Sequence, residues 1–318
     1  MKRLLYKFIL GGVLVSVASC QKDFTDLKPT AQFTDAVYFK QPNDFKAFAT
    51  SFYGQLPGWD FNTMDNNSDL SANTNAAGYD LGHGTIATNT TDNWNYSNIR
   101  VCNILLTKAN EFTGAKAAIS QYVSEAYFFR AFAYFNLLKT YGGVPIVTGV
   151  LDVTSAELQA PRNSRYEVMK QILSDLDAAI EGLPLEQAIA PTDKGRISKM
   201  AAKAFKAQVE LYEATWEKYV GKTTDGDGTS IGAGSAGYDA ANVNKYLTDA
   251  VALCKDVIEN GGYAIWNKNA VASMANASSW YLFNLEDAGS NPGGFDKSSN
   301  TEFILYNVYD YTLKRGGR

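Results

Sequence analysis

Cys20 lies at a position where a cysteine is typically modified by lipid. A short basic start and an apolar run, Phe8 to Val17, lead to Val17-Ala18-Ser19-Cys20, the pattern of a lipobox. Such a segment directs export, acylation of the cysteine thiol and cleavage that makes the cysteine the new N-terminus. The apolar run is far shorter than the roughly 20 residues that a membrane span needs. We predict a signal peptide over residues 1–19 and a lipoprotein anchored through Cys20 to the outside of an inner or outer membrane.

The titratable residues carry no recognisable catalytic pattern. The single histidine, His83, lies between two glycines with no serine or cysteine motif beside it. A general base needs a partner group within hydrogen-bond reach, so this pattern favours a solvated loop histidine. A glycoside hydrolase needs two carboxylates across a cleft, and no motif pairs any two of the acidic residues. We predict no catalytic residue.

The sequence also contains no clear motif for binding a metal, a cofactor or nucleic acid. Residues 223–229 resemble a calcium loop but lack its third acidic position and its bidentate glutamate. Cys102 and Cys254 lie in apolar helical patterns and are interpreted as small buried side chains, with a disulfide between them as the alternative. The net charge is −4 and no basic stripe occurs, which argues against nucleic acid as a partner. We expect no metal and no cofactor.

Amphipathic helices must position any site. Apolar residues recur at helical spacing in six stretches, and Gly142-Gly143 and Gly261-Gly262 are typical helix stops. Ser164 and Glu167 have the spacing of a capping box. The predicted helices cover residues 43–56 (with Asn43 as N-cap), 93–112, 116–141, 164–182, 198–219 and 242–260.

These stretches predict a mainly α fold. We expect tetratricopeptide-like helix pairs that form an α-helical scaffold, with an irregular loop-rich region and few short strands, although no strict 34-residue period occurs. Residues 20–40 are predicted to be a polar stalk and residues 41–318 one helical-repeat domain. Residues 302–309 have the pattern of a single strand, and because a lone strand needs partners, we expect this domain to be incomplete at its C-terminus. Four tryptophans are assigned to the core: Trp94, Trp216, Trp266 and Trp280.

Residues 57–92 form the longest polar stretch. Asn, Asp, Thr, Ser and Gly dominate it, with aromatic residues interspersed. Compact domains seldom keep so long a loop unless it has a function. This stretch is therefore the first candidate for a binding site.

Five motifs occur in order along the chain: Cys20 to Pro29, Trp94 to Ile99, Glu125 to Phe135 with its continuation to Pro145, Pro161 to Ser164, and Gly195 to Ala204. Together they resemble one known family, the SusD/RagB surface lipoproteins of Gram-negative outer membranes. Each motif is weak alone, but the combination is specific and spans nearly all of the chain. Members usually continue well beyond this length.

The resemblance implies both a fold and a function. The fold is built on four tetratricopeptide-like helix pairs. The implied function is to capture oligosaccharide or polysaccharide at the outer-membrane surface and to deliver it to a SusC-like TonB-dependent transporter, without catalysis. Some members are thought to bind peptides, so a peptide ligand remains an alternative, as does a surface hydrolase on a helical scaffold.

Sugar recognition suggests candidate ligand residues. Aromatic faces stack on sugar rings, while amides and carboxylates bond the hydroxyl groups. Alternatively, Trp59 packs under its own loop and the asparagines build turns. The candidates are Trp59, Asp65, Asn66 and Tyr79 in the polar stretch, with Tyr309 and Asp310 after the expected strand.

Overall fold

The computed structural model describes residues 38–58, 94–223 and 232–306. The chain divides into two compact units, residues 1–40 and 41–318, and the second unit contains all the helices described below. Its α-helices are α2 (Pro42–Thr50), α4 (Ser97–Glu111), α5 (Ser120–Tyr141), α6 (Arg165–Gly182), α7 (Lys199–Val220), α8 (Asn242–Asn260) and α9 (Ser278–Tyr281). Short 3₁₀ helices are η2 (Ser51–Gln55), η4 (Lys116–Ala118), η5 (Ala156–Gln159), η6 (Glu186–Ala188), η7 (Pro191–Asp193), η8 (Ala272–Met274) and η9 (Lys297–Ser299).

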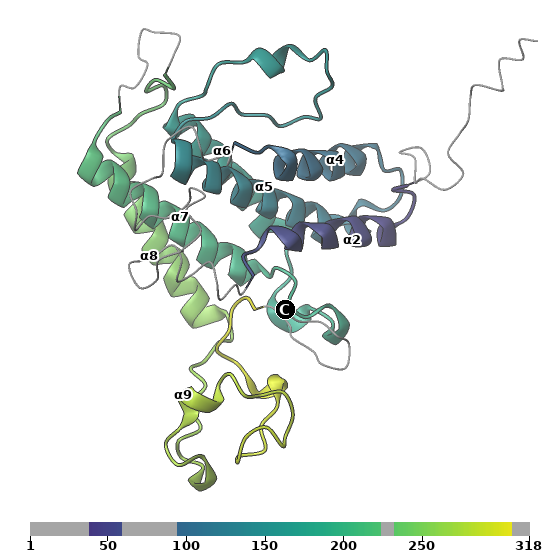
Figure 1. Cartoon of the computed structure of the whole chain (residues 1–318), viewed down its shortest axis with the longest axis vertical. Helices are drawn as coiled ribbons and strands as arrows, with labels where there is room; N and C mark the ends of the chain where they lie inside the picture. Colours follow the sequence, from purple (N-terminus) through teal and green to yellow (C-terminus); the bar gives the residue numbers. More distant parts are fainter. Residues whose placement is uncertain (1–37, 59–93, 224–231, 307–318) are drawn as a thin grey trace, which may run out of the picture. The chain divides into compact units, whose positions relative to one another are not determined.

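Consecutive helices pack side by side. Helix α4 packs on α5, α5 on α6, α6 on α7 and α7 on α8, while α2 contacts α4 and α5 (Figure 1). This arrangement confirms the predicted mainly α fold of paired helices. Every helix in the described part of the chain is too short or too polar to span a bilayer.

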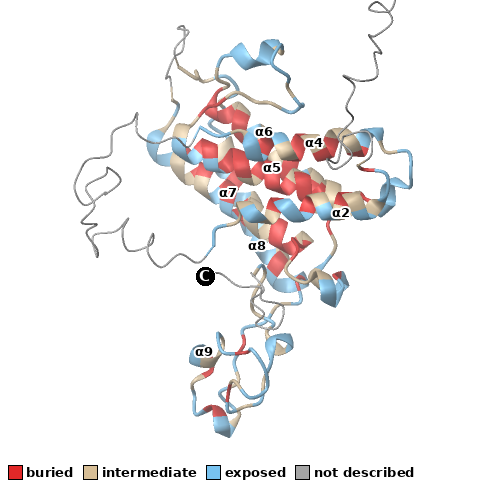
Figure 2. Cartoon of the chain, turned by 45° about the vertical axis from the view of Figure 1, so that its right-hand side comes forward, coloured by how far each residue is buried: buried red, intermediate tan, exposed pale blue. Residues whose placement is uncertain are grey.

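Helix α5 forms the centre of the hydrophobic core. Buried residues occur on nearly all its sides (Figure 2), as expected of a helix that has neighbours all around it. The ring of Phe129 lies 5.8 Å from the ring of Phe52 in η2. The ring of Phe128 lies 5.3 Å from the ring of Phe205 on α7. The aromatic residues of α5 therefore hold elements on both sides of the stack.

The capping box at the start of α6 is confirmed. The Glu167 backbone N–H donates to Ser164 Oγ at 3.1 Å, and the Ser164 backbone N–H donates to Glu167 Oε2 at 2.9 Å. The Ser164 hydroxyl also donates to the backbone carbonyl of Ala236. At the first helix the prediction was wrong in detail, since Gln41 rather than Asn43 is the N-cap of α2.

Ser164→Ala is expected to lower the free energy of unfolding by about 1–2 kcal/mol, because the variant loses the N-cap hydrogen bond and leaves a carbonyl without its donor. Urea unfolding followed by circular dichroism measures the change. Ser174→Ala is the matched control on the same helix, since Ser174 is exposed. Equal stability of the two variants would contradict a stabilising role for the cap.

Three buried arginine–carboxylate pairs tie the stack together. Glu125 and Arg130 lie in the motif that runs from Glu125 to Phe135, and Arg196 lies in the motif from Gly195 to Ala204. These two motifs therefore contain charged residues that link one helix to another. Because a carboxylate and a guanidinium can form two parallel hydrogen bonds, such pairs are directional. The pairs are Arg130–Asp175 (α5 to α6), Arg165–Glu213 (α6 to α7) and Arg196–Glu125 (the turn before α7 to α5), each at 2.6 Å.

The expected strand over residues 302–309 is wrong for its described part. Residues 302–306 are irregular, and no strand occurs anywhere in the described ranges. The backbone N–H groups of Glu302 and Phe303 both donate to Asn300 Oδ1, at 2.9 and 3.3 Å. These two donors are used locally, and the Ala264 N–H donates to the Thr301 carbonyl at 2.9 Å without extending into a ladder. Residues 307–309 lie outside the described part of the chain.

Several burial predictions need correction. Cys102 is buried as predicted, but Cys254 is exposed, and both thiols are free. Trp266 is buried in a small cluster with Met274 and Leu285, whereas Trp280 is 73% exposed on the four-residue helix α9. The other two tryptophans assigned to the core are half-buried (Trp216) and 41% exposed (Trp94).

Candidate functional site

The residues that the sequence nominated lie outside the described ranges. This holds for the lipidation residue and for all six ligand candidates, and also for His83 and for residues 224–229 of the calcium-like segment. All of these assignments stay predictions. The residues concerned are Cys20, Trp59, Asp65, Asn66, Tyr79, Tyr309 and Asp310.

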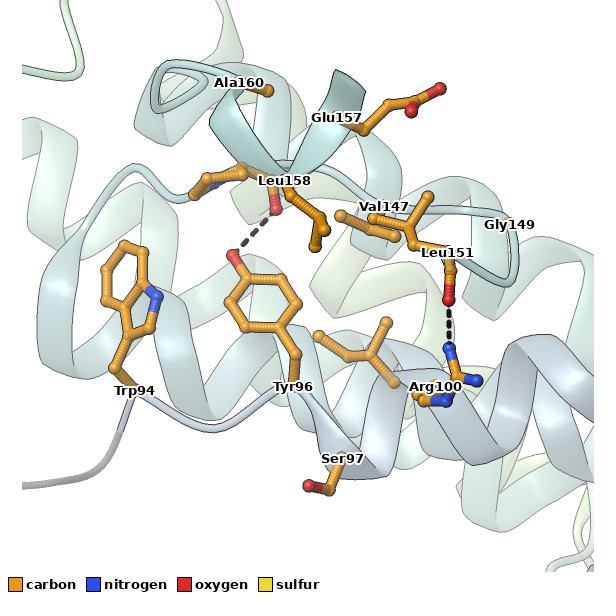
Figure 3. Close-up of a pocket in the computed structure, with 12 residues that line it drawn as sticks. Trp94, Tyr96, Ser97, Arg100, Val147, Gly149, Leu151, Glu157, Leu158 and Ala160 are labelled. Atoms are coloured by element: carbon orange, nitrogen blue, oxygen red, sulfur yellow. Dashed lines mark hydrogen bonds between the residues drawn. The ribbon is translucent and has the colours of Figure 1, made fainter. Parts of the chain in front are cut away.

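A pocket of about 410 Å³ lies beside the start of α4 (Figure 3). One side comes from residues 94–100, and the other comes from the segment 145–160, which includes η5. Its lining residues are Trp94, Tyr96, Ser97, Ile99, Arg100, Pro145, Val147, Gly149, Leu151, Glu157, Leu158 and Ala160.

Aromatic rings form one end of the pocket. The Trp94 indole is 41% exposed and contacts the ring of Tyr141 edge-on, with centroids 4.9 Å apart. The Tyr96 hydroxyl donates to the Pro145 carbonyl at 2.8 Å, and burial raises the pKa of this phenol. Both rings are therefore held in place while part of the indole remains accessible to a ligand.

The other end of the pocket is polar and carries a positive charge. Arg100 is exposed, and its Nη1 donates to the Leu151 carbonyl at 2.5 Å. Leu158, 55% exposed, adds an apolar surface between the two ends. The carboxylate of Glu157 points away from Arg100 (Figure 3).

Buried side chains hold the pocket wall in place of a strand partner. The Tyr134 hydroxyl donates to the Val147 carbonyl at 3.0 Å and accepts the Val147 N–H at 2.7 Å. Asn103 Nδ2 donates to the carbonyls of Val147 and Gly149, at 3.0 and 2.9 Å. These bonds hold the segment in place although it joins no sheet.

The ion pair of Arg130 supports this wall. Arg130 Nη1 donates to Asn103 Oδ1 at 2.8 Å, while the same guanidinium binds Asp175 through Nε and Nη2 at 2.8 and 2.6 Å. Asn103 is fully buried and is oriented by this contact toward the carbonyls of Val147 and Gly149. The core network of α4, α5 and α6 thus positions one side of the pocket.

At the start of α6, the chain is also closely packed. Arg162 donates to the backbone carbonyls of Gly143 and Tyr141, at 2.7 and 2.6 Å. These bonds provide donors for carbonyl groups at the C-terminal end of α5. A Cβ atom at Gly143 would lie 2.1 Å from the Asn163 carbonyl oxygen, so only glycine fits there. The Gly-Gly stop and the Pro161–Ser164 motif are therefore packed against each other.

The described lining of the pocket combines surfaces for stacking with hydrogen-bond donors. Its aromatic and apolar surfaces suit the apolar face of a ring, and Arg100 and Ser97 offer hydrogen-bond donors. Glu157 is the one carboxylate among the lining residues that the structure describes. Sequence reasoning missed this site because it placed Trp94 inside a helix over residues 93–112 and assigned it to the core. In the structure, α4 begins only at Ser97, so Trp94 precedes the helix.

Comparisons with known proteins agree on one family. The model of a SusD-like family described as "Starch-binding associating with outer membrane" matches residues 31–211. A SusD-like protein of Bacteroides ovatus is 25% identical over 221 residues, which cover 65% of this chain and 39% of the relative. SusD-like protein P38 of Formosa agariphila is 39% identical over 98 residues, 31% of this chain and 18% of the relative.

A solved structure supports the same fold. The crystal structure of a SusD-like protein from Bacteroides fragilis matches with a TM-score of 0.60 at 21% identity, covering 89% of this chain and 48% of that chain. The chain thus spans less than half the length of these relatives. With more than half of its own residues matched by the family model, the chain belongs to the SusD-like family.

Proposed function

We propose that this protein binds oligosaccharide or polysaccharide at the cell surface and delivers it to a TonB-dependent transporter of the outer membrane. In this proposal, the protein is not an enzyme, and lipid on Cys20 anchors it to the membrane. Membership of a family described as starch-binding and associated with the outer membrane supports the proposal. The observation that carries it is the partly exposed Trp94 at one end of a formed pocket.

Two sets of residues are proposed to contact the ligand. The first set is the pocket of Trp94, Tyr96 and Arg100. The second set consists of the residues nominated from sequence: Trp59, Asp65, Asn66, Tyr79, Tyr309 and Asp310.

Electrophoresis through gels that contain polysaccharide tests glycan binding. Retarded migration without soluble products supports the proposal. Released sugars would instead indicate the alternative, a hydrolase, and retention of peptides but not glycans would indicate a peptide-binding member. Co-purification with an outer-membrane transporter, measured separately, tests delivery.

Trp94→Ala is expected to weaken glycan binding about tenfold, because loss of one stacking ring costs roughly 1–1.5 kcal/mol. Trp280→Ala is the matched control, since Trp280 is 73% exposed but lies on α9 and does not line the pocket. Trp59→Ala is expected to weaken binding as well, without loss of helical circular dichroism. If Trp94→Ala binds like the wild type, the ligand does not use this pocket.

A further inference from the structure

We propose that the pocket beside α4 selects glycans that carry an anionic group, a uronate carboxylate or a sulfate ester, and that Arg100 binds this group. The inference rests on the proposed function and adds the chemical class of the ligand. Its basis is the contrast between Arg100 and the other arginines of the described residues.

The Arg100 side chain is held at the pocket by one hydrogen bond, which leaves most of its N–H donors available. A guanidinium has five N–H donors, and the bond from Nη1 to the Leu151 carbonyl occupies one of them. This bond fixes the side chain at the polar end of the pocket (Figure 3). Within the described ranges, no carboxylate forms a salt bridge with Arg100. An exposed guanidinium with remaining donors can bind a carboxylate or sulfate through two parallel hydrogen bonds.

The other described arginines are committed to the fold. Arg130, Arg165 and Arg196 each pair with a buried carboxylate, and Arg162 binds two backbone carbonyls. Arg100 differs from all four because it is exposed and makes a single hydrogen bond to the protein, so most of its donors remain open to the pocket.

Helix stability does not explain the presence of a cation at position 100. Arg100 is the fourth residue of α4, and the first turn of this helix contains no acidic residue. Because the N-terminus of a helix is the positive end of its dipole, a cation there is mildly unfavourable and an anion favourable. A bound anion would compensate both the helix terminus and the guanidinium.

The spacing from the aromatic end fits a single glycan. The Arg100 N–H donates to the Tyr96 carbonyl at 2.8 Å, so the two residues stand one helical turn apart and on the same face. The Tyr96 ring points toward the segment 145–160 (Figure 3), and Arg100 reaches the carbonyl of Leu151 in that segment. A sugar ring at the aromatic end therefore places a charged substituent of the same chain within reach of Arg100.

The test uses the full chain and isothermal titration calorimetry. Polygalacturonate is compared with its fully methyl-esterified form, and dextran sulfate with dextran. At least one anionic polymer is expected to bind about tenfold more tightly than its neutral counterpart, and Arg100→Gln is expected to abolish this preference. Arg100→Lys should retain part of the preference, since it keeps the charge but loses the fork of donors. Lys255→Gln is the control, because Lys255 is exposed on α8.

The outcomes separate the two proposals. Preference for polygalacturonate identifies a uronate ligand, and preference for dextran sulfate identifies a sulfated one; loss of either preference in Arg100→Gln supports the inference. Glycan binding without an anionic preference, or with a preference that Arg100→Gln retains, overturns the inference but leaves glycan binding intact. If neither these polymers nor other neutral polysaccharides bind, the proposed function itself is wrong.

Discussion

Asp175→Asn is expected to lower the free energy of unfolding by about 3–5 kcal/mol, because it removes one partner of a buried ion pair. Asp175 is 2% exposed and Arg130 is 5% exposed, so the guanidinium left behind would have neither water nor a countercharge. Typical domains are stable by only about 5–15 kcal/mol, so this single change threatens the fold. Urea unfolding followed by circular dichroism measures the loss.

Asp177→Asn provides a matched control two residues along α6. The Asp177 carboxylate is 63% exposed and pairs with Lys206, and exposed pairs contribute about 1 kcal/mol or less. A double variant, Arg130→Met with Asp175→Leu, should recover part of the lost stability, since apolar replacement removes both buried charges. Asp175→Asn with the stability of Asp177→Asn would disprove a structural role for the ion pair.

The same variant connects the core to the pocket. Arg130 also orients Asn103, which holds the carbonyls of Val147 and Gly149 in the pocket wall. Destabilising the ion pair should therefore loosen the wall as well as the helices. The position of the pocket wall thus depends on the Arg130–Asp175 ion pair, although neither residue lines the pocket.

The second large effect is a pH dependence caused by two buried carboxylates on α7. Glu210 and Glu217 are 0% and 3% exposed, and none of their carboxylate oxygens has a hydrogen-bond partner among the described residues. Burial raises the pKa of both carboxyl groups from 4.5 to about 7, with the Glu213 carboxylate adding to the effect at Glu217. Lys206, whose Nζ lies 3.9 Å from Glu210 Oε1, opposes the shift only in part.

The sign of the effect follows from proton linkage. Between pH 4.5 and pH 7 the folded protein binds more protons at these residues than the unfolded chain does. Their contribution therefore favours folding most at low pH and is lost as the pH rises through about 7. From pH 5 to pH 8, each carboxylate is expected to reduce the free energy of unfolding by about 2 kcal/mol.

Glu210→Gln and Glu217→Gln should each remove that residue's share of the pH dependence. The slope of stability against pH is compared, because a buried amide brings its own constant cost at every pH. Glu259→Gln on α8 is the control, since the Glu259 side chain is 57% exposed and should leave the slope unchanged. Slopes that stay equal to the wild type in both α7 variants would show that the two carboxylates are solvated.

Local features of the fold could be predicted from the sequence because their interactions span a few residues. The capping box of Ser164 and Glu167 joins positions three apart, and the glycine stop at Gly142 adopts a φ of 70° that ends α5. Apolar spacing likewise placed α5, α6, α7 and α8 within a few residues of their observed bounds.

Burial could not be predicted so well, because periodicity shows which residues share a helix face but not what covers that face. Cys102 and Cys254 lie in similar apolar patterns, yet Cys102 is packed in the core while Cys254 is exposed. Beside it on α8, Val251 and Ile258 are 69% and 75% exposed. The same reasoning misplaced Trp94 in the core.

The sequence by itself determined most of the helices, the cap of α6 and, through motifs in order, the family. Tertiary structure decided the charge pairs and the pocket, because both join residues far apart in the chain. Arg130 and Asp175 are 45 positions apart, and Arg100 is 51 positions from Leu151. Only the packing of α4, α5 and α6 brings these groups together, and it is this packing that leaves Arg100 facing the pocket.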